Sequence, residues 1–257
     1  GRIFGGQVIA QSLLAAYETV EARLCHSLHC YFIRSGDPKA PIVFEVDRSR
    51  DGGSFTTRRV VAIQGGKQIF NLAASFKGPE AGFRHQAKMP PGPHWSELED
   101  EAEVRRKLMT QASEQTRRWL SRSPPIDIRS KDVRTYWMDG EPKEPVTQNW
   151  FRSRTPVGDD PRMHQVLLAY ASDMTLLSTA MRPHKVHWQT PGMQSASLDH
   201  AMWFHEPTDF NQWHLYAHDS PSASDGRAFV RGQIFAEDGT LVASTAQEGL
   251  VRMKPAN

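Results

Sequence analysis

The sequence predicts an α+β fold in which one series of elements occurs twice. Each half has a long segment with helical periodicity, and strand-like runs that include a glycine-containing hairpin follow it. The Ser27-Leu28 pair also recurs as Ser197-Leu198, 170 residues later, near the start of the strands in each half. These observations predict an internal duplication in which each half packs one helix against an antiparallel sheet.

The first helix is predicted within residues 7–22, directly after Gly5-Gly6, because its apolar residues fit a helical period. Those residues are Val8, Ile9, Leu13, Ala16, Tyr17 and Val20. Four strand-like runs follow, at 27–35, 42–50, 55–64 and 67–77. The last two are joined by Gly65-Gly66, a dipeptide that suits a two-residue hairpin.

The segment between the halves is rich in Gly and Pro at 78–93, which is typical of a linker. A charged helix is predicted at 95–122, with Leu98, Leu108, Trp119 and Leu120 as its apolar anchors, and Pro124-Pro125 end it. The predicted organisation is an N-terminal unit at 1–78, a linker with a charged helix at 79–125, and a C-terminal unit at 126–257.

The second half begins with strand-like runs near 133–138 and 148–155. Asp160 suits the cap of the next helix and Pro161 its first residue, so a helix is predicted from there to about Met181, before Pro183. Strand-like runs follow at 196–205, 213–218, 228–236 and 241–251, with Asp238-Gly239 as the hairpin between the last two.

The composition excludes several classes of function. The net charge is +2 in 257 residues and charges of both signs are interspersed, which indicates no nucleic-acid partner. No apolar run reaches the roughly 20 residues of a membrane span, and no signal peptide is recognisable. We expect no metal, because no Cys/His cluster has ligand spacing and His205-Glu206 lacks the second His of an H-E-x-x-H motif.

The two cysteines, Cys25 and Cys30, favour a reducing compartment, and we expect the cytoplasm. The final residues, Lys-Pro-Ala-Asn, carry no Ser-Lys-Leu peroxisomal signal. A peroxisomal location is expected only if the protein is eukaryotic and this sequence is truncated.

Three polar residues interrupt faces that otherwise look buried. Asp173 lies on an apolar helix face, three and four residues from Tyr170, Ala169, Leu176 and Leu177. Gln247 lies on an apolar strand face, and Ser197 begins a strand. A buried carboxylate needs hydrogen bonds or an adjacent water. For each residue taken alone, a structural role stays open: a surface-leaning Asp, a core Gln bonded to backbone, or an ordinary Ser.

Together these residues carry a resemblance. The strings GRIFGGQVIAQSLLAA, YASDMTLLSTA, SLDHAMWFHEP and FVRGQIFAEDGTLVASTAQEG resemble the type II acyl-CoA thioesterases, the TesB-like double-hotdog family, in family order and over nearly the whole chain. The resemblance implies two tandem hotdog repeats and a catalytic group formed by Asp173, Ser197 and Gln247. It also implies that one or two strands precede the Phe-Gly-Gly-Gln string in the complete protein.

The resemblance further implies hydrolysis of fatty acyl-CoA to fatty acid and coenzyme A, with coenzyme A as part of the substrate and no separate cofactor. The residues suit this chemistry, because a thioester needs little acid help at its leaving thiol, whose pKa is about 8.5. Asp173 could then accept a proton from an oriented water, with its pKa raised by partial burial, while Ser197 and Gln247 hold that water or the carbonyl. We also expect at least a dimer of the two-hotdog unit.

Weaker candidates accompany these three. The N–H groups of Gly5, Gly6 and Gln7 open the first helix and could bind a carbonyl oxygen or a phosphate, although the glycines could instead permit close packing. Arg58 and Arg59, with Arg48 and Arg50, could meet the phosphates of coenzyme A or could form a solvated strand face.

A Ser197/Asp199/His200 triad is not favoured. Strand alternation places His200 on the face opposite Ser197, and no G-x-S-x-G string is present. Asp199 and His200 are therefore interpreted as structural or interface residues.

Two other functions stay open. One is a hotdog enoyl-CoA hydratase or dehydratase. Such enzymes resemble one another through a His or Asp/His motif on the helix, and no such His is found near Asp173, since His164 lies more than two turns earlier. The other is a non-catalytic acyl-CoA binding protein. The sequence indicates no preference for acyl chain length.

Overall fold

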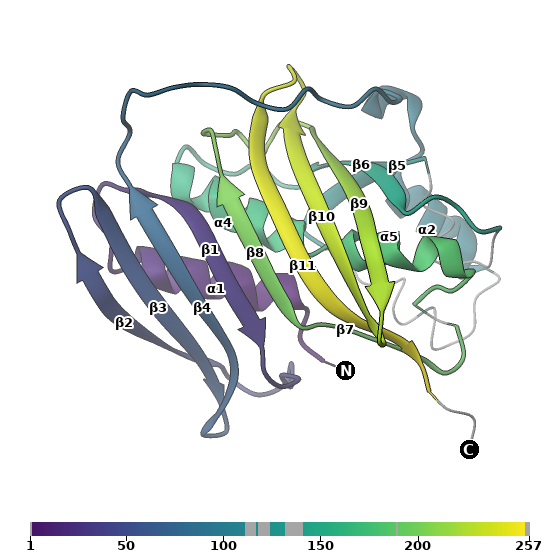
Figure 1. The fold of residues 1–257 in the computed structure, drawn as a ribbon, viewed down its shortest axis with the longest axis horizontal. Helices are drawn as coiled ribbons and strands as arrows, with labels where there is room; N and C mark the ends of the chain where they lie inside the picture. The colour runs from purple at the N-terminus through teal and green to yellow at the C-terminus, as the bar shows by residue number, and fades with distance from the viewer. Residues whose placement is uncertain (1, 111–116, 118–123, 132–140, 189, 255–257) are drawn as a thin grey trace.

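All eleven strands of the described chain belong to one antiparallel sheet, and the main helices cover one face of it (Figure 1). The computed structural model describes residues 2–110, 117, 124–131, 141–188 and 190–254. The α+β prediction is confirmed. Within the described residues, no helix is both long and apolar enough to cross a membrane.

The first half contains one helix and a four-stranded part of the sheet. Its elements are α1 (Gly5–Tyr17), β1 (Leu24–Phe32), β2 (Val43–Asp51), β3 (Phe55–Gln64) and β4 (Lys67–Lys77). Helix α1 forms because Ile9, Leu13 and Ala16 recur at helical spacing, and all three are fully buried. The predicted hairpin between β3 and β4 is confirmed, since Gly65 and Gly66 have φ values of 56° and 73°.

The remaining elements lie between the two halves or within the second half. They are η1 (Trp95–Glu97), α2 (Glu101–Met109), β5 (Ile126–Ser130), β6 (Val146–Ser153), α4 (Pro161–Ser172), α5 (Leu176–Met181), η3 (Arg182–His184), β7 (Met193–Ser197), β8 (Asp199–Phe204), β9 (His214–Ser224), β10 (Arg227–Ala236) and β11 (Leu241–Met253).

The strand order reflects the predicted duplication. It runs β2-β3-β4-β1-β8-β11-β10-β9-β6-β5, with β7 paired to β11 beside this path. Strands β1 and β8 pair antiparallel at the centre, where Cys30 lies opposite His200. A meander of three strands extends outward from each of them, β4-β3-β2 on one side and β11-β10-β9 on the other.

Helices α1 and α4 pack antiparallel on this sheet and join the two halves. Gly6, at the start of α1, lies beside Tyr170, near the end of α4. At the other end of α1, the Tyr17 hydroxyl donates to Gln165 of α4. One large hydrophobic cluster includes α1, α4 and the central strands of both halves. The end of α4 is thereby fixed against the start of α1.

Several sequence predictions differ from the structure. The charged helix predicted at 95–122 is not continuous, because η1 ends at Glu97, Leu98 is extended, and α2 begins only at Glu101. The helix predicted from Pro161 to about Met181 is interrupted, because α4 ends at Ser172, α5 begins at Leu176, and Thr175 between them has a φ of 62°. Strand β5 was not predicted, although Ile126 and Ile128 are buried in it. The strand predicted near 133–138 lies outside the described residues, as do Trp119 and Leu120.

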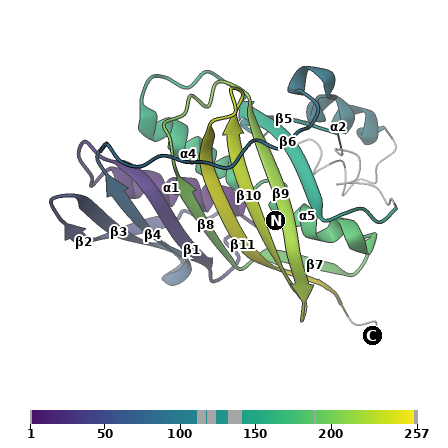
Figure 2. The same ribbon diagram turned by 45° about the horizontal axis from the view of Figure 1, so that its top comes forward.

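The predicted linker crosses the sheet on the face opposite the helices (Figure 2). Residues 78–94 have no regular structure and lead from β4 to η1 at the far side of the sheet. Gln86 fastens the segment to the β10–β11 hairpin, since its amide donates to the Gly239 carbonyl (2.8 Å) and accepts from the Leu241 N–H (3.1 Å). Whether the predicted boundaries near residues 78 and 125 delimit independent units stays a prediction.

Candidate active site

Asp173 lies in the break between α4 and α5. The Asp160 side chain caps the start of α4, accepting from the Arg162 N–H at 3.0 Å, and Pro161 occupies the first turn as predicted. The helix ends where Thr175 adopts its left-handed conformation, so Asp173 is the C-cap residue. The prediction that Asp173 sits within a continuous helix was wrong, because α4 ends at Ser172 and α5 begins only at Leu176.

The carboxylate of Asp173 brings the three predicted catalytic residues together. Ser197 Oγ donates to Asp173 Oδ1 at 3.2 Å, and Gln247 Nε2 donates to Ser197 Oγ at 2.9 Å. The backbone N–H of Gly6 donates to Asp173 Oδ2 at 2.9 Å. The site therefore lies at the junction of the halves, with one contact from the first half and three side chains from the second.

The two glycines at the start of α1 are required by close approach. A Cβ on Gly5 would lie 2.6 Å from Asp173 Oδ2, and a Cβ on Gly6 would lie 2.2 Å from the Tyr170 carbonyl oxygen. This supports the predicted close packing, and it also places a helix N–H on the carboxylate. Gln7 contributes neither to the close packing nor to the hydrogen bonds of Asp173. Its N–H donates to the Phe4 carbonyl, and its side chain is exposed.

Burial raises the pKa of Asp173 to about 6, although hydrogen bonding from Ser197, Gln247 and Gly6 and the nearby charge of Arg2 act in the opposite direction. The carboxylate is thus ionised at neutral pH, but it binds a proton far more readily than an exposed Asp. Ser197, Gly6 and Gln247 together use up to three of the roughly four lone pairs of the carboxylate, so capacity for one bond from a water is left. This capacity and pKa fit a general base.

His200 contacts this site, contrary to the prediction that it points away from Ser197. Its Nδ1 lies 2.6 Å from Gln247 Oε1 and its Nε2 lies 2.9 Å from Ser172 Oγ. The reason is a bulge: Ser197 pairs with Gly249 and Ala201 with Ala246, so three residues of one chain segment face two of β11. The extra residue reverses the alternation, and both Ser197 and His200 reach Gln247. A histidine does therefore lie near Asp173, on a strand rather than a helix.

Arg58 and Arg59 lie on opposite faces of β3. The Arg58 side chain is buried, and its guanidinium donates to Thr19 Oγ1 (2.8 Å), the Thr19 carbonyl (2.9 Å) and Asp51 Oδ1 (2.5 Å). Because these internal partners hold the group under α1, we no longer assign it to the phosphates of coenzyme A. Arg59 is exposed on the outer face and stays a candidate.

We expect Arg58→Lys to lower the free energy of unfolding by about 2 kcal/mol, because an ammonium cannot replace a fork of buried guanidinium bonds. Arg59→Lys is the matched control and should change stability by less than about 0.5 kcal/mol, since its side chain is exposed. Urea unfolding of both variants measures the difference. Equal stability of the two variants would contradict the structural role of Arg58.

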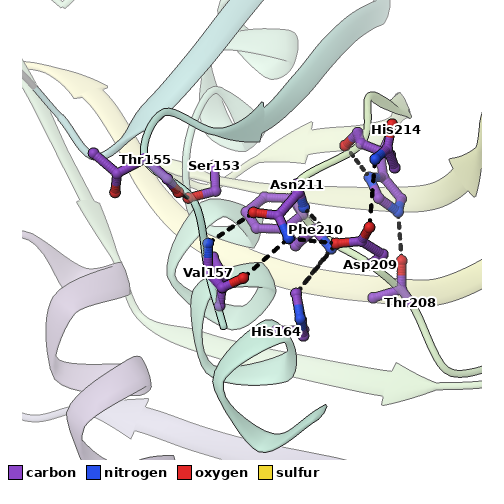
Figure 3. Close-up of polar contacts among 10 residues, drawn as sticks. Ser153, Thr155, Val157, His164, Thr208, Asp209, Phe210, Asn211 and His214 are labelled. Carbon is purple, nitrogen blue, oxygen red and sulfur yellow. Dashed lines mark hydrogen bonds and ion pairs between the residues drawn. The ribbon is translucent and has the colours of Figure 1, made fainter. Parts of the chain in front are cut away.

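His164 has a structural role in the loop between β8 and β9 (Figure 3). Its Nδ1 accepts from the Phe210 N–H at 3.0 Å, and Asp209 Oδ1 lies 3.7 Å away. In the same loop, Asn211 accepts from the Val157 N–H at 2.7 Å. His164 is therefore committed to fixing this loop, which agrees with its exclusion as a hydratase histidine.

A small cavity adjoins the chain segment that carries Asp173. Its wall is mostly apolar and comes from β5, β6, the end of α4 and β9, and it is lined by Ile126, Ile128, Asn149, Phe151, Ala171, Met174, Thr175 and Tyr216. Sequence reasoning did not place this lining, and its two β5 residues, Ile126 and Ile128, lie on a strand that was not predicted. Among the described residues, no group of three or more His, Cys, Asp or Glu side chains could hold a metal ion.

Family comparisons agree with this geometry. A family model described as acyl-CoA thioesterase matches residues 126–250, and one described as acyl-CoA thioesterase N-terminal domain matches residues 1–77. The acyl-CoA thioesterase 2 of Haemophilus influenzae is 39% identical over 253 residues, covering 98% of this chain and 88% of that protein.

The chain belongs to the acyl-CoA thioesterase family.

Solved structures confirm the double-hotdog fold of this thioesterase family member. An acyl-CoA thioesterase II from Mycobacterium marinum has 42% sequence identity and a TM-score of 0.79, with coverage of 98% of this chain and 90% of that one. A hot dog fold protein from Alicyclobacillus acidocaldarius, 20% identical with a TM-score of 0.74, covers 98% and 88% and shares the fold.

Proposed function

We propose that this protein hydrolyses fatty acyl-CoA thioesters to free fatty acid and coenzyme A through a water activated by Asp173. The observation that carries the proposal is the desolvated carboxylate of Asp173, held by Gly6 and Ser197 and linked through Ser197 to Gln247. Membership of the acyl-CoA thioesterase family supports the reaction class.

In the proposed reaction, a water donates one hydrogen bond to Asp173 and attacks the thioester carbonyl. Asp173 accepts the proton as the oxygen–carbon bond forms, which is favoured by a pKa of about 6. The tetrahedral intermediate then expels the coenzyme A thiolate, and the proton on Asp173 returns to that sulfur. The products are one fatty acid and one thiol, and no further cofactor is required.

In this proposal, the start of α1 stabilises the negative charge that develops on the thioester carbonyl oxygen. The first N–H groups of a helix have no intrahelical acceptor, and they lie at the positive end of the helix dipole. The Gly6 N–H is used by Asp173 and that of Gln7 by Phe4, whereas that of Gly5 has no acceptor among the described residues. We place the thioester oxygen there, beside the carboxylate.

We assign candidate contacts for the acyl chain and for coenzyme A from the positions of residues around Asp173 and on the outer face of the sheet. The apolar residues around Met174 are our candidate lining for the acyl chain, although the cavity there has room for only about one water and must open to admit a chain. Exposed Arg59 is retained as a candidate for the phosphates of coenzyme A. Both cysteines are free and buried, which supports a reducing compartment and our proposal of a cytoplasmic role in fatty acid metabolism. We also propose a homo-oligomer of the double-hotdog unit.

The decisive test is release of free thiol from a series of saturated acyl-CoA substrates of increasing chain length. Hydrolysis of at least one of them is expected. Binding without thiol release would instead support the non-catalytic binding protein, and addition of water to an enoyl-CoA without thiol release would support the hydratase.

The pH dependence of kcat/KM should report Asp173 directly. Its pKa is raised to about 6, so the base is protonated below that pH and ionised above it. Activity is therefore expected to rise as the pH increases through about 6 and to level off above it. An acid limb near pH 4, the range of an ordinary Asp, would show that the carboxylate is not desolvated as described.

A further inference from the structure

His200 is nearly fully buried, and its two ring nitrogens are paired with Gln247 and Ser172 rather than with the proposed base, Asp173. It lies on β8, its Nδ1 is 2.6 Å from Gln247 Oε1, and its Nε2 is 2.9 Å from Ser172 Oγ. Burial lowers the pKa of His200 to about 4, so the ring is neutral at physiological pH. A neutral imidazole has one N–H and one acceptor nitrogen, and the choice between them decides the direction of every neighbouring hydrogen bond.

The hydrogen bonds that join His200, Gln247, Ser197 and Asp173 can run in only two consistent donor-to-acceptor directions. If Nδ1 carries the proton, it donates to Gln247 Oε1, the Gln247 amide N–H donates to Ser197 Oγ, and the Ser197 hydroxyl is free to donate to Asp173. If Nε2 carries the proton, it donates to Ser172 Oγ, and the Ser172 hydroxyl donates to the Ala169 carbonyl oxygen (2.9 Å). The Gln247 amide must then turn over to donate to Nδ1. Its oxygen then accepts from Ser197, and Asp173 loses the Ser197 hydrogen bond.

We propose that His200 is a positioning residue that fixes the amide of Gln247, and through Ser197 the carboxylate of Asp173, in the orientation that activates water. This inference rests on the proposed hydrolysis and adds to it a residue that touches neither substrate nor water. The ionised carboxylate selects the Nδ1–H tautomer, because a hydrogen bond to a charged acceptor is stronger than one between neutral groups. The Ser172 hydroxyl has two acceptors within reach, the Ala169 carbonyl oxygen (2.9 Å) and His200 Nε2 (2.9 Å), and in this tautomer its single proton is donated to Nε2.

The tautomer of His200 tests the proposal without substrate. Long-range proton–nitrogen NMR of the ¹⁵N-labelled wild-type protein at about pH 7.5 distinguishes a protonated ring nitrogen from an acceptor nitrogen. The His200 signals are identified by their loss in His200→Asn. We expect Nδ1 to be protonated and Nε2 to be unprotonated. The opposite assignment would overturn the proposal, whether or not the protein hydrolyses acyl-CoA.

The kinetic test compares two substitutions of the same residue. His200→Leu removes both ring nitrogens, and we expect kcat to fall about tenfold or more with little change in KM. His200→Asn retains a side-chain N–H near the position of Nδ1 and should keep kcat within about threefold of the wild-type value. A purely structural role would instead make both variants lose activity in proportion to their loss of thermal stability, which would overturn the proposal.

A double-mutant cycle with Gln247 shows whether His200 acts through that residue. In a Gln247→Ala background the amide is absent, so His200→Leu should cause no further loss of kcat. Independent, multiplicative losses would contradict a positioning role. If wild-type hydrolysis is present and depends on Asp173, these results judge His200 alone, whereas an inactive wild-type protein would refute the proposed function instead.

Discussion

Asp173→Asn is expected to reduce kcat by about 10²–10⁴ while the protein remains folded. The substitution keeps the shape of the side chain and its ability to accept from the Gly6 N–H, but it removes the base that takes the proton from water. Thiol release from the best acyl-CoA substrate measures the loss, and circular dichroism verifies the fold.

The matched control is Asp199→Asn, which removes a carboxylate two residues from Ser197. Asp199 Oδ1 accepts from the backbone N–H of Glu248 at 2.7 Å and has a role in the strand pair rather than at the reacting carbon. Its variant should keep most of the wild-type kcat. Equal losses in the two variants would mean that removing charge near the bulge, and not removing the base, abolishes activity.

Alanine at Gly5 or Gly6 is expected to have the second largest effect, for different reasons at the two positions. In Gly5→Ala the new methyl group would meet Asp173 Oδ2 at 2.6 Å, and the carboxylate must turn away from the site, so we expect kcat to fall at least about tenfold. In Gly6→Ala the methyl group would meet the Tyr170 backbone oxygen at 2.2 Å, and α1 must move relative to α4. That overpacking should lower the free energy of unfolding by about 1–3 kcal/mol.

Gly53→Ala is the control for both substitutions, because a Cβ at Gly53 has no atom within 4 Å. We expect its kcat and melting temperature to match those of the wild-type protein. Steady-state kinetics and thermal unfolding of the three variants separate the site effect from the packing effect. Wild-type activity in Gly5→Ala would show that Asp173 does not need the space beside α1.

Sequence periodicity predicted most of the sheet because its strands have buried and exposed faces that alternate regularly. In β3, buried Thr56, Arg58, Val60 and Ala62 alternate with less buried residues, and the predicted bounds of 55–64 are those observed. The three catalytic candidates were predicted through the family resemblance, and the structure places them in contact. Alone, each polar residue would have been compatible with an ordinary structural role.

The parts that sequence did not predict depend on single backbone irregularities. The bulge at residues 198–200 is not visible in side-chain alternation, because it depends on the register of β11. The helix break depends on the φ of 62° at Thr175, a conformation that is uncommon for Thr and that no sequence pattern indicated. Both irregularities lie at the site: the bulge brings His200 to Gln247, and the helix break leaves Asp173 at the end of α4.

Arg58 shows a different limit of sequence interpretation, namely that a charged residue can be assigned to a ligand when it is in fact buried. Its charge suggested a phosphate ligand, but alternation in β3 places it on the buried face, where Thr19 and Asp51 satisfy it. The sequence did contain this information, since Val60 and Ala62 share that face with Arg58. The partners could not be predicted, because Thr19 belongs to the turn after α1, and its position depends on how the helix ends.

The central claim is that folding desolvates the half-buried Asp173 carboxylate enough to raise its pKa, and this is tested most directly by the pH dependence of stability. Because the pKa of Asp173 is raised to about 6 in the folded protein, the ionised group destabilises the fold above that pH, and the cost disappears as the pH falls toward the pKa of an unfolded Asp. The measurement is the free energy of unfolding of wild-type protein and Asp173→Asn at about pH 7.5 and about pH 4.5. We predict that the Asn variant is more stable by about 2 kcal/mol at the higher pH and that most of this difference is lost at the lower one. An Asn variant that is equally stable or less stable at the higher pH would contradict the desolvated base on which the mechanism depends.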